Sequence, residues 1–475
     1  MRISEIFNLN KSQPELDFVD VDIDRDTPLF LDPFFLSLRT DRWSLSASDT
    51  IRSFFQQVIR AIREDNIQVG KDLFAYLHEP NATCLGLSEG KPMGRGVGVE
   101  NTDDIFESIV NSRAIQSGVI TDLEDNLLFV NGFGKDKLSD MTTNIIRKHL
   151  LEYTVSQCKL HNIALTENIP SGFYWNREAL QWEQSYEESL VVDGKQILLV
   201  PKGIISYSRS YVPDKYYNHY VLNFMQSEHL RLNSALVQRR VNGTRYVTKK
   251  DLKEKNPLSK EFLIGFTNRN PEVLKKFKDE TQINSLSNLE LTNIDINRLL
   301  ASLSAQLRQT PAGAENAGNY HTLILGILDL LFYPHLIYPK KENEIHDGRK
   351  RIDITFDNGA KEGIFHRLHN SMRLPCSYIM VECKNYSSDP ANPELDQLGG
   401  RFSPNRGTVG LLVCRDINNF NLFLQRCRDT YRDNRGLIIP VIDEDILSLL
   451  NNYDPMNFQY MDRFLSERIR QIAIN

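Results

Sequence analysis

Two short stretches decide the fold of the last third of this chain: Arg351-Ile-Asp-Ile-Thr-Phe356 and Ile379-Met-Val-Glu-Cys-Lys384. Each is an apolar run that predicts a β-strand. Successive side chains of a strand point to opposite faces, so Glu382 and Lys384 share one face and the cysteine between them occupies the other. If the two strands pair in one sheet, Asp353 joins the face of Glu382 and Lys384. Folding alone gives no reason to place three charged groups beside buried strands, because burying them costs free energy.

These three charged groups together suggest a hydrolytic site. Two carboxylates can hold a hard divalent cation such as Mg²⁺ or Mn²⁺, and a nearby lysine can orient or deprotonate a water molecule. The combination suits metal-assisted hydrolysis of a phosphodiester. The alternative is a half-exposed strand that carries an incidental ion pair.

The triplet of an acidic residue, any residue and lysine is a weak signal by itself, because it recurs in this chain. Glu89-Gly-Lys91, Asp193-Gly-Lys195 and Asp251-Leu-Lys253 also contain it. The first lies in a glycine-rich loop, the second at an Asp-Gly hairpin turn, and the third in a charged, solvated stretch. Only the triplet at Glu382 closes a longer strand-like segment.

The sequence around this segment predicts an ordered series of helices and strands. Apolar residues between 319 and 332 recur at helical spacing and predict a strongly apolar helix. The predicted order is then α-β-β-β-α-β, with elements at 319–332, 351–356, 362–366, 377–384, from 393, and 408–414. A helix at about 420–432, a strand at 436–441 and a helix from 443 follow.

This order of elements and the spacing of Asp353 from the Glu-x-Lys triplet resemble the PD-(D/E)XK nuclease superfamily, which has the restriction-endonuclease-like fold. Within that superfamily, Glu382-Cys-Lys-Asn-Tyr386 followed by Gln397-Leu-Gly-Gly-Arg-Phe402 is similar to Mrr-type and Holliday-junction-resolvase-like members. The resemblance covers approximately residues 312–450. For the first 290 residues no such resemblance is evident.

The resemblance implies a role for each residue of the site. Asp353 and Glu382 would bind the metal, and the backbone carbonyl of Cys383 would be a third ligand. Lys384 would position or activate a magnesium-bound water for in-line attack on a phosphodiester. Gln397 would support the site from the following helix.

One position of the family pattern is open in this sequence. Relatives often carry a glutamate on the first helix, where it completes the metal site or holds the water. The equivalent register here falls near Tyr320 and His321, whereas the nearest carboxylate is Glu315, at or just before the start of the helix. Glu315 is therefore a candidate catalytic residue, with His321 as a substitute. An ordinary helix-start acid, favoured by the helix dipole, is the alternative interpretation of Glu315.

The chain of 475 residues is longer than a typical domain, so we expect two or three domains of an α/β or mixed α+β protein. We place a mixed α+β region of unknown fold, with a recognition, regulatory or assembly role, at residues 1–290. The nuclease domain, with its restriction-endonuclease-like core, would occupy residues 291–475. In the first region the sequence predicts a helix capped at Ser48, a helix at 144–159 and a hairpin turning at Asp193-Gly194.

The formal net charge of −6 does not indicate nucleic-acid binding, although local patches guide contact more than the total does. One such patch lies at residues 239–260, with Arg239, Arg240, Arg245, Lys249, Lys250, Lys253, Lys255 and Lys260. It is either an arm that binds phosphates or, more simply, a solvated and mobile linker. The glycines of loop 86–98, with Lys91 and Arg95, could bind an anion through backbone amides. A flexible loop is the simpler interpretation there too, because the loop lacks a Walker motif.

The cysteines and the N-terminus bear on the compartment. Six cysteines are scattered without a CxxC pair or a Cys/His cluster, which argues against a zinc site and favours free thiols in a reducing compartment. The N-terminus lacks a basic-then-apolar signal, and no apolar run approaches the length of a membrane span. We therefore expect a cytoplasmic protein with no membrane partner.

These observations predict a magnesium-dependent endonuclease. The resemblance favours DNA as the substrate, and RNA is not excluded. A nuclease domain after a sensor-like region also resembles prokaryotic anti-phage defence effectors, which is an analogy. Because one site cuts one strand, we expect a homo-oligomer or a complex with a partner protein. Two alternatives remain: a nucleic-acid-binding module without activity, and an interaction subunit that is silent until a partner or ligand activates it.

Overall fold

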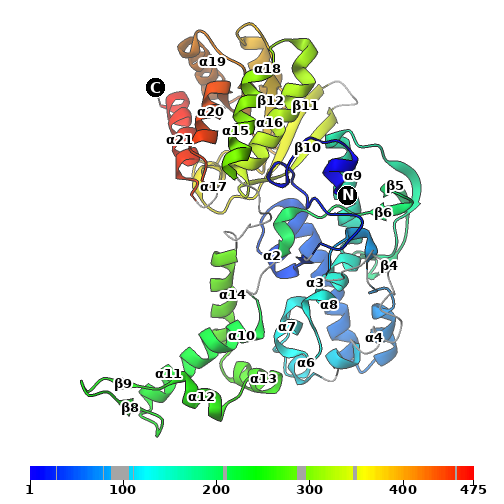
Figure 1. Cartoon of the computed structure of the whole chain (residues 1–475), viewed down its shortest axis with the longest axis vertical. Coiled ribbons are helices and arrows are strands. Elements are labelled where there is room, and N and C mark those ends of the chain that lie inside the picture. Colours follow the sequence, from blue (N-terminus) through cyan, green and yellow to red (C-terminus); the bar gives the residue numbers. More distant parts are fainter. Residues whose placement is uncertain are drawn as a thin grey trace.

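The computed structural model describes the whole chain except residues 28, 79, 87–105, 111, 207–210, 286–295, 346–349, 455–456 and 475. Its apolar side chains form two hydrophobic cores (Figure 1). One core runs from Ile3 to Phe277 and also takes in Ile337 and Tyr338. The other runs from Leu303 to Ile472 and takes in Leu160. The boundary that the sequence predicts between two regions lies outside the described residues.

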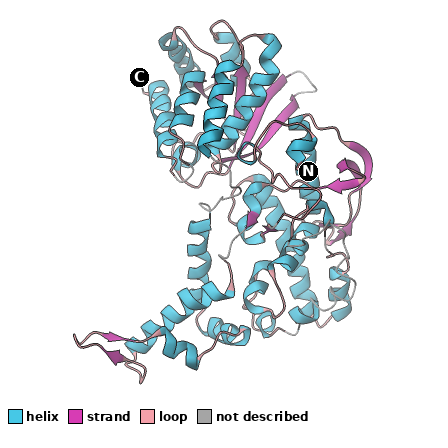
Figure 2. Ribbon diagram, viewed as in Figure 1, coloured by secondary structure: helices cyan, strands magenta, loops and turns pink. Residues whose placement is uncertain are grey.

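Five strands form one mixed sheet in the C-terminal region (Figure 2). In spatial order they are β10 (Leu336–Ile345), β11 (Lys350–Asn358), β12 (Tyr378–Lys384), β13 (Val409–Cys414) and β14 (Leu437–Ile442). β10, β11 and β12 pair antiparallel, whereas β12, β13 and β14 pair parallel. The C-terminal region is thus a mixed α/β fold, as the sequence predicts.

Helices cover both faces of this sheet (Figures 1 and 2). They are α15 (Ile296–Gln309), η6 (Ala314–Asn316), α16 (Ala317–Phe332), α17 (Gly363–Asn370), α18 (Asn392–Gly399), α19 (Phe420–Arg432), α20 (Asp443–Asn451) and α21 (Gln459–Ala473). Every residue of β13 is buried, and so is every residue of β12 after the first. A strand buried on both faces explains why the sequence is continuously apolar at β13.

The strand predicted at 362–366 is wrong, because these residues enter helix α17. Ile364, Phe365 and Leu368 are buried together on one side of that helix, a spacing that a strand would divide between two faces. The remaining strand of the antiparallel part of the sheet is instead β10, which precedes β11 in the chain and which sequence reasoning missed. β10 contains Pro339 and several charged residues, which are typical of a strand at the edge of a sheet.

The N-terminal region is largely helical, with short strands at its surface. Its elements are α1 (Ile3–Ile6), η1 (Gln13–Glu15), β1 (Phe30–Leu31), α2 (Pro33–Ser37), α3 (Arg42–Arg63), α4 (Ile67–Phe74), η2 (Asn81–Thr83), α6 (Arg113–Gln116), η3 (Leu123–Asp125), α7 (Asn126–Phe129), α8 (Lys135–Ile145), α9 (Arg147–His161), β2 (Thr166–Pro170), β3 (Tyr174–Asn176), β4 (Gln181–Glu183), β5 (Tyr186–Val192), β6 (Lys195–Ile197), η4 (Lys202–Ile204) and β7 (Ile205–Ser206).

Two of the three predicted elements of this region are found near their expected positions. α9 lies close to the helix predicted at 144–159, and β5 and β6 form the hairpin, with positive φ angles of 48° at Asp193 and 74° at Gly194. The cap predicted at Ser48 is wrong. α3 begins earlier because the Asp41 side chain accepts a hydrogen bond from the Ser44 amide (2.8 Å), and this capping bond starts the helix two turns sooner.

Residues 213–285 continue the chain as helices and a hairpin. They form α10 (Pro213–Tyr216), η5 (Tyr217–Val221), α11 (Leu222–Arg231), β8 (Gln238–Arg239), β9 (Arg245–Tyr246), α12 (Lys249–Lys255), α13 (Lys260–Arg269) and α14 (Pro271–Ser285). The linker interpretation of the basic stretch 239–260 is therefore wrong, because these residues form a hairpin and helices. The glycine-rich loop after Gly86 lies outside the described residues.

A buried polar network joins the two cores. The Tyr338 amide of β10 donates to Asp17 Oδ1 (3.1 Å), and the Tyr338 hydroxyl lies 2.9 Å from Ser44 Oγ. Lys202 of η4 pairs with Asp329 of α16 at 2.9 Å, with both side chains less than 5% exposed. Because the charges at this junction are paired, the free-energy cost of burying them is partly offset.

Two further observations concern the length of the helices and the state of the cysteines. In the ranges given above, no helix is both long and apolar enough to cross a membrane. All six cysteines are buried free thiols.

Candidate active site

The two stretches that suggested a site pair with each other in the sheet. Ile354 of β11 lies opposite Val381 of β12, so the same register places Asp353 beside Glu382. The Cys383 amide donates a hydrogen bond to Asp353 Oδ2 (2.8 Å). Asp353 is therefore held at the end of β12 where the Glu-x-Lys triplet lies.

Glu382 is the centre of a closed hydrogen-bonded cluster. Its Oε1 accepts from Lys384 Nζ (2.8 Å) and from Gln397 Nε2 (2.7 Å), and its Oε2 accepts from Arg401. Lys384 Nζ also donates to Gln397 Oε1 (3.1 Å). The side chain of Glu382 is 1% exposed and that of Lys384 is 11% exposed. The structure thus brings together Glu382, Lys384 and Gln397, with Asp353 beside them.

The electrostatics of the cluster follow from burial and pairing. Burial and the nearby charge of Asp353 raise the pKa of Glu382, although Lys384 and Arg401 act in the opposite direction. Burial disfavours the charged form of Lys384, but its hydrogen bond and ion pair with Glu382 raise the pKa of Lys384 overall. In this arrangement Lys384 is an ammonium at neutral pH, suited to orienting a water or neutralising charge rather than to removing a proton.

The cysteine between the two charged residues serves the fold. By strand alternation its side chain points to the face opposite Glu382, and it is 2% exposed within the second core. Burial raises the pKa of the Cys383 thiol well above its ordinary value. Cys383 can therefore contribute to a site only through its backbone, as the resemblance implies.

Glu315 lies near the end of β12 but outside the cluster. Asn385, which follows Lys384, binds the loop before η6: its side-chain amide donates to Pro311 O and Gly313 O, and its carbonyl accepts from the Gly313 amide. Glu315 in η6 is exposed. In the described part of the chain, no hydrogen bond or ion pair joins Glu315 to the cluster.

The register at which relatives carry a glutamate is filled by other side chains. Tyr320 is buried, and its hydroxyl donates to Asp443 Oδ1 (2.8 Å). The other oxygen of Asp443, Oδ2, pairs with Arg415 at 3.1 Å. His321 is half-buried, and its ring contacts that of Tyr320. Tyr320 is thus committed to a structural network, and the part that Glu315 or His321 plays stays a prediction.

Arg401 is the member of the cluster that sequence reasoning missed. It stands within the quoted stretch Gln397–Phe402, but no role was assigned to it. Arg401 follows Gln397 by four residues, a spacing that brings two side chains to the same side of a helical turn. Its side chain is 5% exposed, and its Nε is buried and has no hydrogen-bond partner among the residues that the structure describes. The four-residue spacing from Gln397 was the available sequence signal, but it does not show that Arg401 contacts Glu382.

The donor set fits a hard divalent cation. The carboxylates of Asp353 and Glu382 and the Cys383 carbonyl supply oxygen, which Mg²⁺ and Mn²⁺ prefer. Among the described residues, no group of three or more His, Cys, Asp or Glu side chains is arranged to hold a metal. Because Arg401 and Lys384 engage both oxygens of Glu382, a cation that binds Glu382 competes with these two positive charges.

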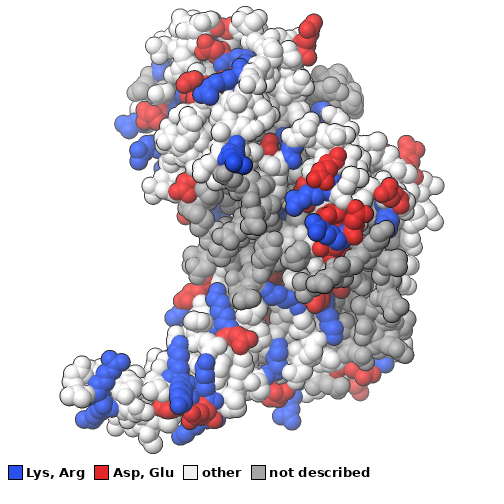
Figure 3. Space-filling view, in the orientation of Figure 1, with Lys and Arg blue, Asp and Glu red and all other residues white. Residues whose placement is uncertain are grey.

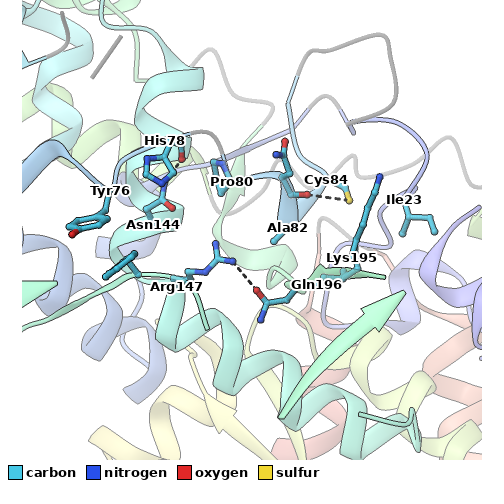
Figure 4. Close-up of a pocket in the computed structure, with 14 residues that line it drawn as sticks. Ile23, Tyr76, His78, Pro80, Ala82, Cys84, Asn144, Arg147, Lys195 and Gln196 are labelled. Atoms are coloured by element: carbon cyan, nitrogen blue, oxygen red, sulfur yellow. Dashed lines mark hydrogen bonds between the residues drawn. The ribbon is translucent and has the colours of Figure 1, made fainter. Parts of the chain in front are cut away.

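A separate cavity of about 470 Å³ lies in the N-terminal region (Figure 4). Arg147 lines it and donates to two neutral oxygens, Ser171 O and Gln196 Oε1 (2.9 Å for the latter). Tyr76, on another wall, stacks on Phe173 with 4.0 Å between ring centroids. A basic group and stacked aromatic rings therefore face one space that is distinct from the cluster on β12.

Comparisons with known proteins give a family match in the N-terminal region and one distant relative. A family model described as "Domain of unknown function (DUF8370)" matches residues 8–212, which excludes the cluster on β12. The chain is 25% identical over 203 residues to the "Putative transposon gamma-delta 80.3 kDa protein" of Escherichia coli (strain K12). That match covers 41% of this chain and 28% of the relative, so the chain spans less than a third of the relative's length. No solved structure matches the chain.

Proposed function

We propose that this protein is a metal-dependent nuclease that hydrolyses phosphodiester bonds of DNA at the cluster on β11 and β12. The observation that carries this proposal is the closed arrangement of Glu382, Lys384 and Gln397, with Asp353 held beside it. The order α16, β10, β11, β12, α18, β13, with α17 inserted before β12, supports the proposal because it is an α-β-β-β-α-β order like the one that the resemblance implies. Buried charges at a strand end are more typical of a functional site than of a core.

Each residue has a definite task in this proposal. Asp353, Glu382 and the Cys383 carbonyl would hold Mg²⁺ or Mn²⁺. When bound, the cation would polarise the phosphoryl group and make water more acidic. Lys384 orients the attacking water through its ammonium and offsets the negative charge that develops on the phosphate. Gln397 fixes the Lys384 ammonium by accepting its hydrogen bond.

The proposal extends to assembly and biological role. One cluster per chain acts on one strand at a time, so cleavage of both strands calls for a homo-oligomer or a partner protein. A nuclease region that follows a separate N-terminal region is also the plan of prokaryotic anti-phage effectors, and we extend the proposal to that role by analogy.

Plasmid cleavage tests the proposed activity. Supercoiled DNA incubated with magnesium or manganese should be nicked or linearised by the wild type, and not by Asp353→Ala or Lys384→Ala. Lys275→Ala is the control, because it removes an exposed lysine of α14 that belongs to neither the cluster nor the cavity beside Arg147. A folded wild type that binds no divalent cation would contradict the nuclease proposal.

A second candidate is a subunit that stays silent until a partner or ligand activates it. The favouring observation is that cationic groups engage both oxygens of Glu382. The cavity beside Arg147 offers a separate place for a ligand. In this case the wild type binds magnesium but cuts DNA only after the activator is added.

A further inference from the structure

The basic stretch that follows α11 is built into a projecting arm. We define the arm as residues 222–255, which comprise α11, the hairpin β8–β9 and α12. Figure 1 shows this arm extending from the body of the molecule, at the end away from the C-terminal sheet. The hairpin forms its tip, where Val241 is fully exposed.

The charge of the arm is opposite to that of the whole chain. Residues 222–255 contain eight Lys or Arg and three Asp or Glu, a net charge of +5, whereas the whole chain carries −6. Figure 3 shows Lys and Arg side chains gathered over the arm. Besides Arg231, which is also exposed, six of them are exposed: Arg239, Arg240, Arg245, Lys250, Lys253 and Lys255.

These six cations have no acidic partner among the described residues. Arg231 is the arm's only cation with a described ion pair, to Glu228 at 2.8 Å. Asp251, which could have neutralised a neighbour, accepts a hydrogen bond from the uncharged Gln238 (2.9 Å). A surface with such an excess of positive charge attracts a polyanion, so these cations point to a partner that supplies the negative charge.

The arm holds these cations in a fixed arrangement. Leu252 of α12 and Val247 before it are buried in the first core. Gln226 of α11 donates to Val247 O (2.5 Å), which ties α11 to the chain that leaves the hairpin. On the hairpin, the Arg240 guanidinium lies over the Tyr246 ring, 5.2 Å from its centroid. A partner therefore meets a shaped surface rather than a flexible tail.

We propose that the arm binds the phosphate backbone of double-stranded DNA through β8–β9 and α12. A row of unpaired cations on a folded element gains affinity by releasing the counterions condensed on a polyanion. A two-stranded ribbon also has a size that a DNA groove accepts. A duplex is favoured over a single strand because the arm presents no open aromatic platform: Tyr246 is half-buried under Arg240.

This inference is independent of the proposed cleavage. The arm and the cluster on β12 lie toward opposite ends of the molecule (Figure 1), so binding at the arm needs no catalysis. Binding is therefore measured with EDTA present, where no metal-dependent cleavage occurs.

The test is fluorescence anisotropy of a labelled DNA duplex over a series of salt concentrations. The triple variant Arg239→Gln, Arg240→Gln, Arg245→Gln should bind at least about tenfold more weakly, and the slope of log affinity against log salt should fall by about 1 for each lost phosphate contact. The matched control is Arg63→Gln, Arg463→Gln, Arg470→Gln, which removes the same charge from exposed positions outside the arm. It should leave affinity within about twofold of the wild type.

Four results would overturn the proposal. They are equal losses in both triple variants, no loss in the arm variant, tighter binding of a single strand of the same length, and no DNA binding by a wild type that instead binds an acidic protein through the arm. If both variants unfold at the same temperature as the wild type, any loss of affinity concerns binding and not folding.

Discussion

The same three-residue pattern, an acid followed two positions later by lysine, occurs at Glu382–Lys384 in β12 and at Asp251–Lys253 in α12. In the strand the two side chains share a face, and Lys384 Nζ lies 2.8 Å from Glu382 Oε1 in a buried cluster. In the helix, residues two apart do not face each other. Asp251 there turns to Gln238, and Lys253 is exposed. The secondary structure, not the pattern, decides whether the two charges form a site.

The largest difference in stability is expected between variants of the two acids, Glu382 and Asp251. Glu382→Gln removes the counter-charge of buried Lys384 and Arg401, and leaving buried charges unpaired costs about 3–5 kcal/mol. We expect a lower free energy of unfolding and no cleavage. Asp251→Asn should stay within about 0.5 kcal/mol of the wild type. Urea unfolding of the two variants measures the difference, and equal stabilities would contradict the description of the cluster as buried and coupled.

The two lysines extend the comparison to catalysis. Lys384→Met keeps the length of the side chain and removes its charge, so cleavage should fall by about 100- to 1,000-fold, the usual effect of removing a group that stabilises transition-state charge. Lys253→Met removes one cation of the arm and so affects only DNA binding, and at saturating DNA it should cut at the wild-type rate. Initial rates of plasmid nicking, with a short duplex as a second substrate, test both variants. Comparable rates for Lys384→Met and the wild type would remove Lys384 from the mechanism.

Arg401 is a further difference between the two acids: it pairs with Glu382, whereas among the described residues Asp251 has no arginine partner. Arg401 occupies Glu382 Oε2, where it competes with a bound cation. Arg401→Gln should therefore lower the magnesium concentration that gives half-maximal cleavage. It should also lower the unfolding temperature in EDTA, since Glu382 loses a neutralising charge. A higher magnesium requirement would show that Arg401 instead holds Glu382 in its metal-binding position.

The smallest effect concerns a second buried acid of the same sheet, Asp357 of β11. Burial raises the pKa of Asp357 to about 7, although the charge of Lys340 opposes this. The pKa of Asp357 is higher in the folded protein than in the unfolded chain, so the folded state is stabilised by the protonated carboxyl. This contribution to the free energy of unfolding is complete below about pH 4 and is lost as the pH rises through 7. Asp357→Asn should gain stability relative to the wild type over that interval. Unfolding measured at several pH values checks this, and a constant difference would contradict it.

How far the sequence predicts the site depends on the range of the interactions involved. Period-2 alternation within eight residues was enough to place Glu382 and Lys384 on one face and Cys383 on the other. The pairing of Asp353 with this face needed one further assumption, that two neighbouring strands pair. Gln397 and its position on α18 came from the family resemblance.

The missed features depend on contacts distant in sequence. Arg401 reaches Glu382 only because the chain turns after α18, and nothing local to Arg401 indicates this. β10 was missed because the charges that suit an edge strand weaken its apolar pattern. The N-terminal core is held by pairs such as Asp17 with Tyr338, which are 321 residues apart and leave no local signal.

The position of β10 has a practical consequence for dissecting this protein. Leu336 belongs to the second core, whereas the next two residues of the same strand, Ile337 and Tyr338, belong to the first. A fragment that begins at the start of α15 would expose both side chains to water and leave Asp17 behind. Such a fragment should aggregate or unfold, so an isolated C-terminal fragment is a poor assay material. The two regions are better separated by point substitutions than by truncation.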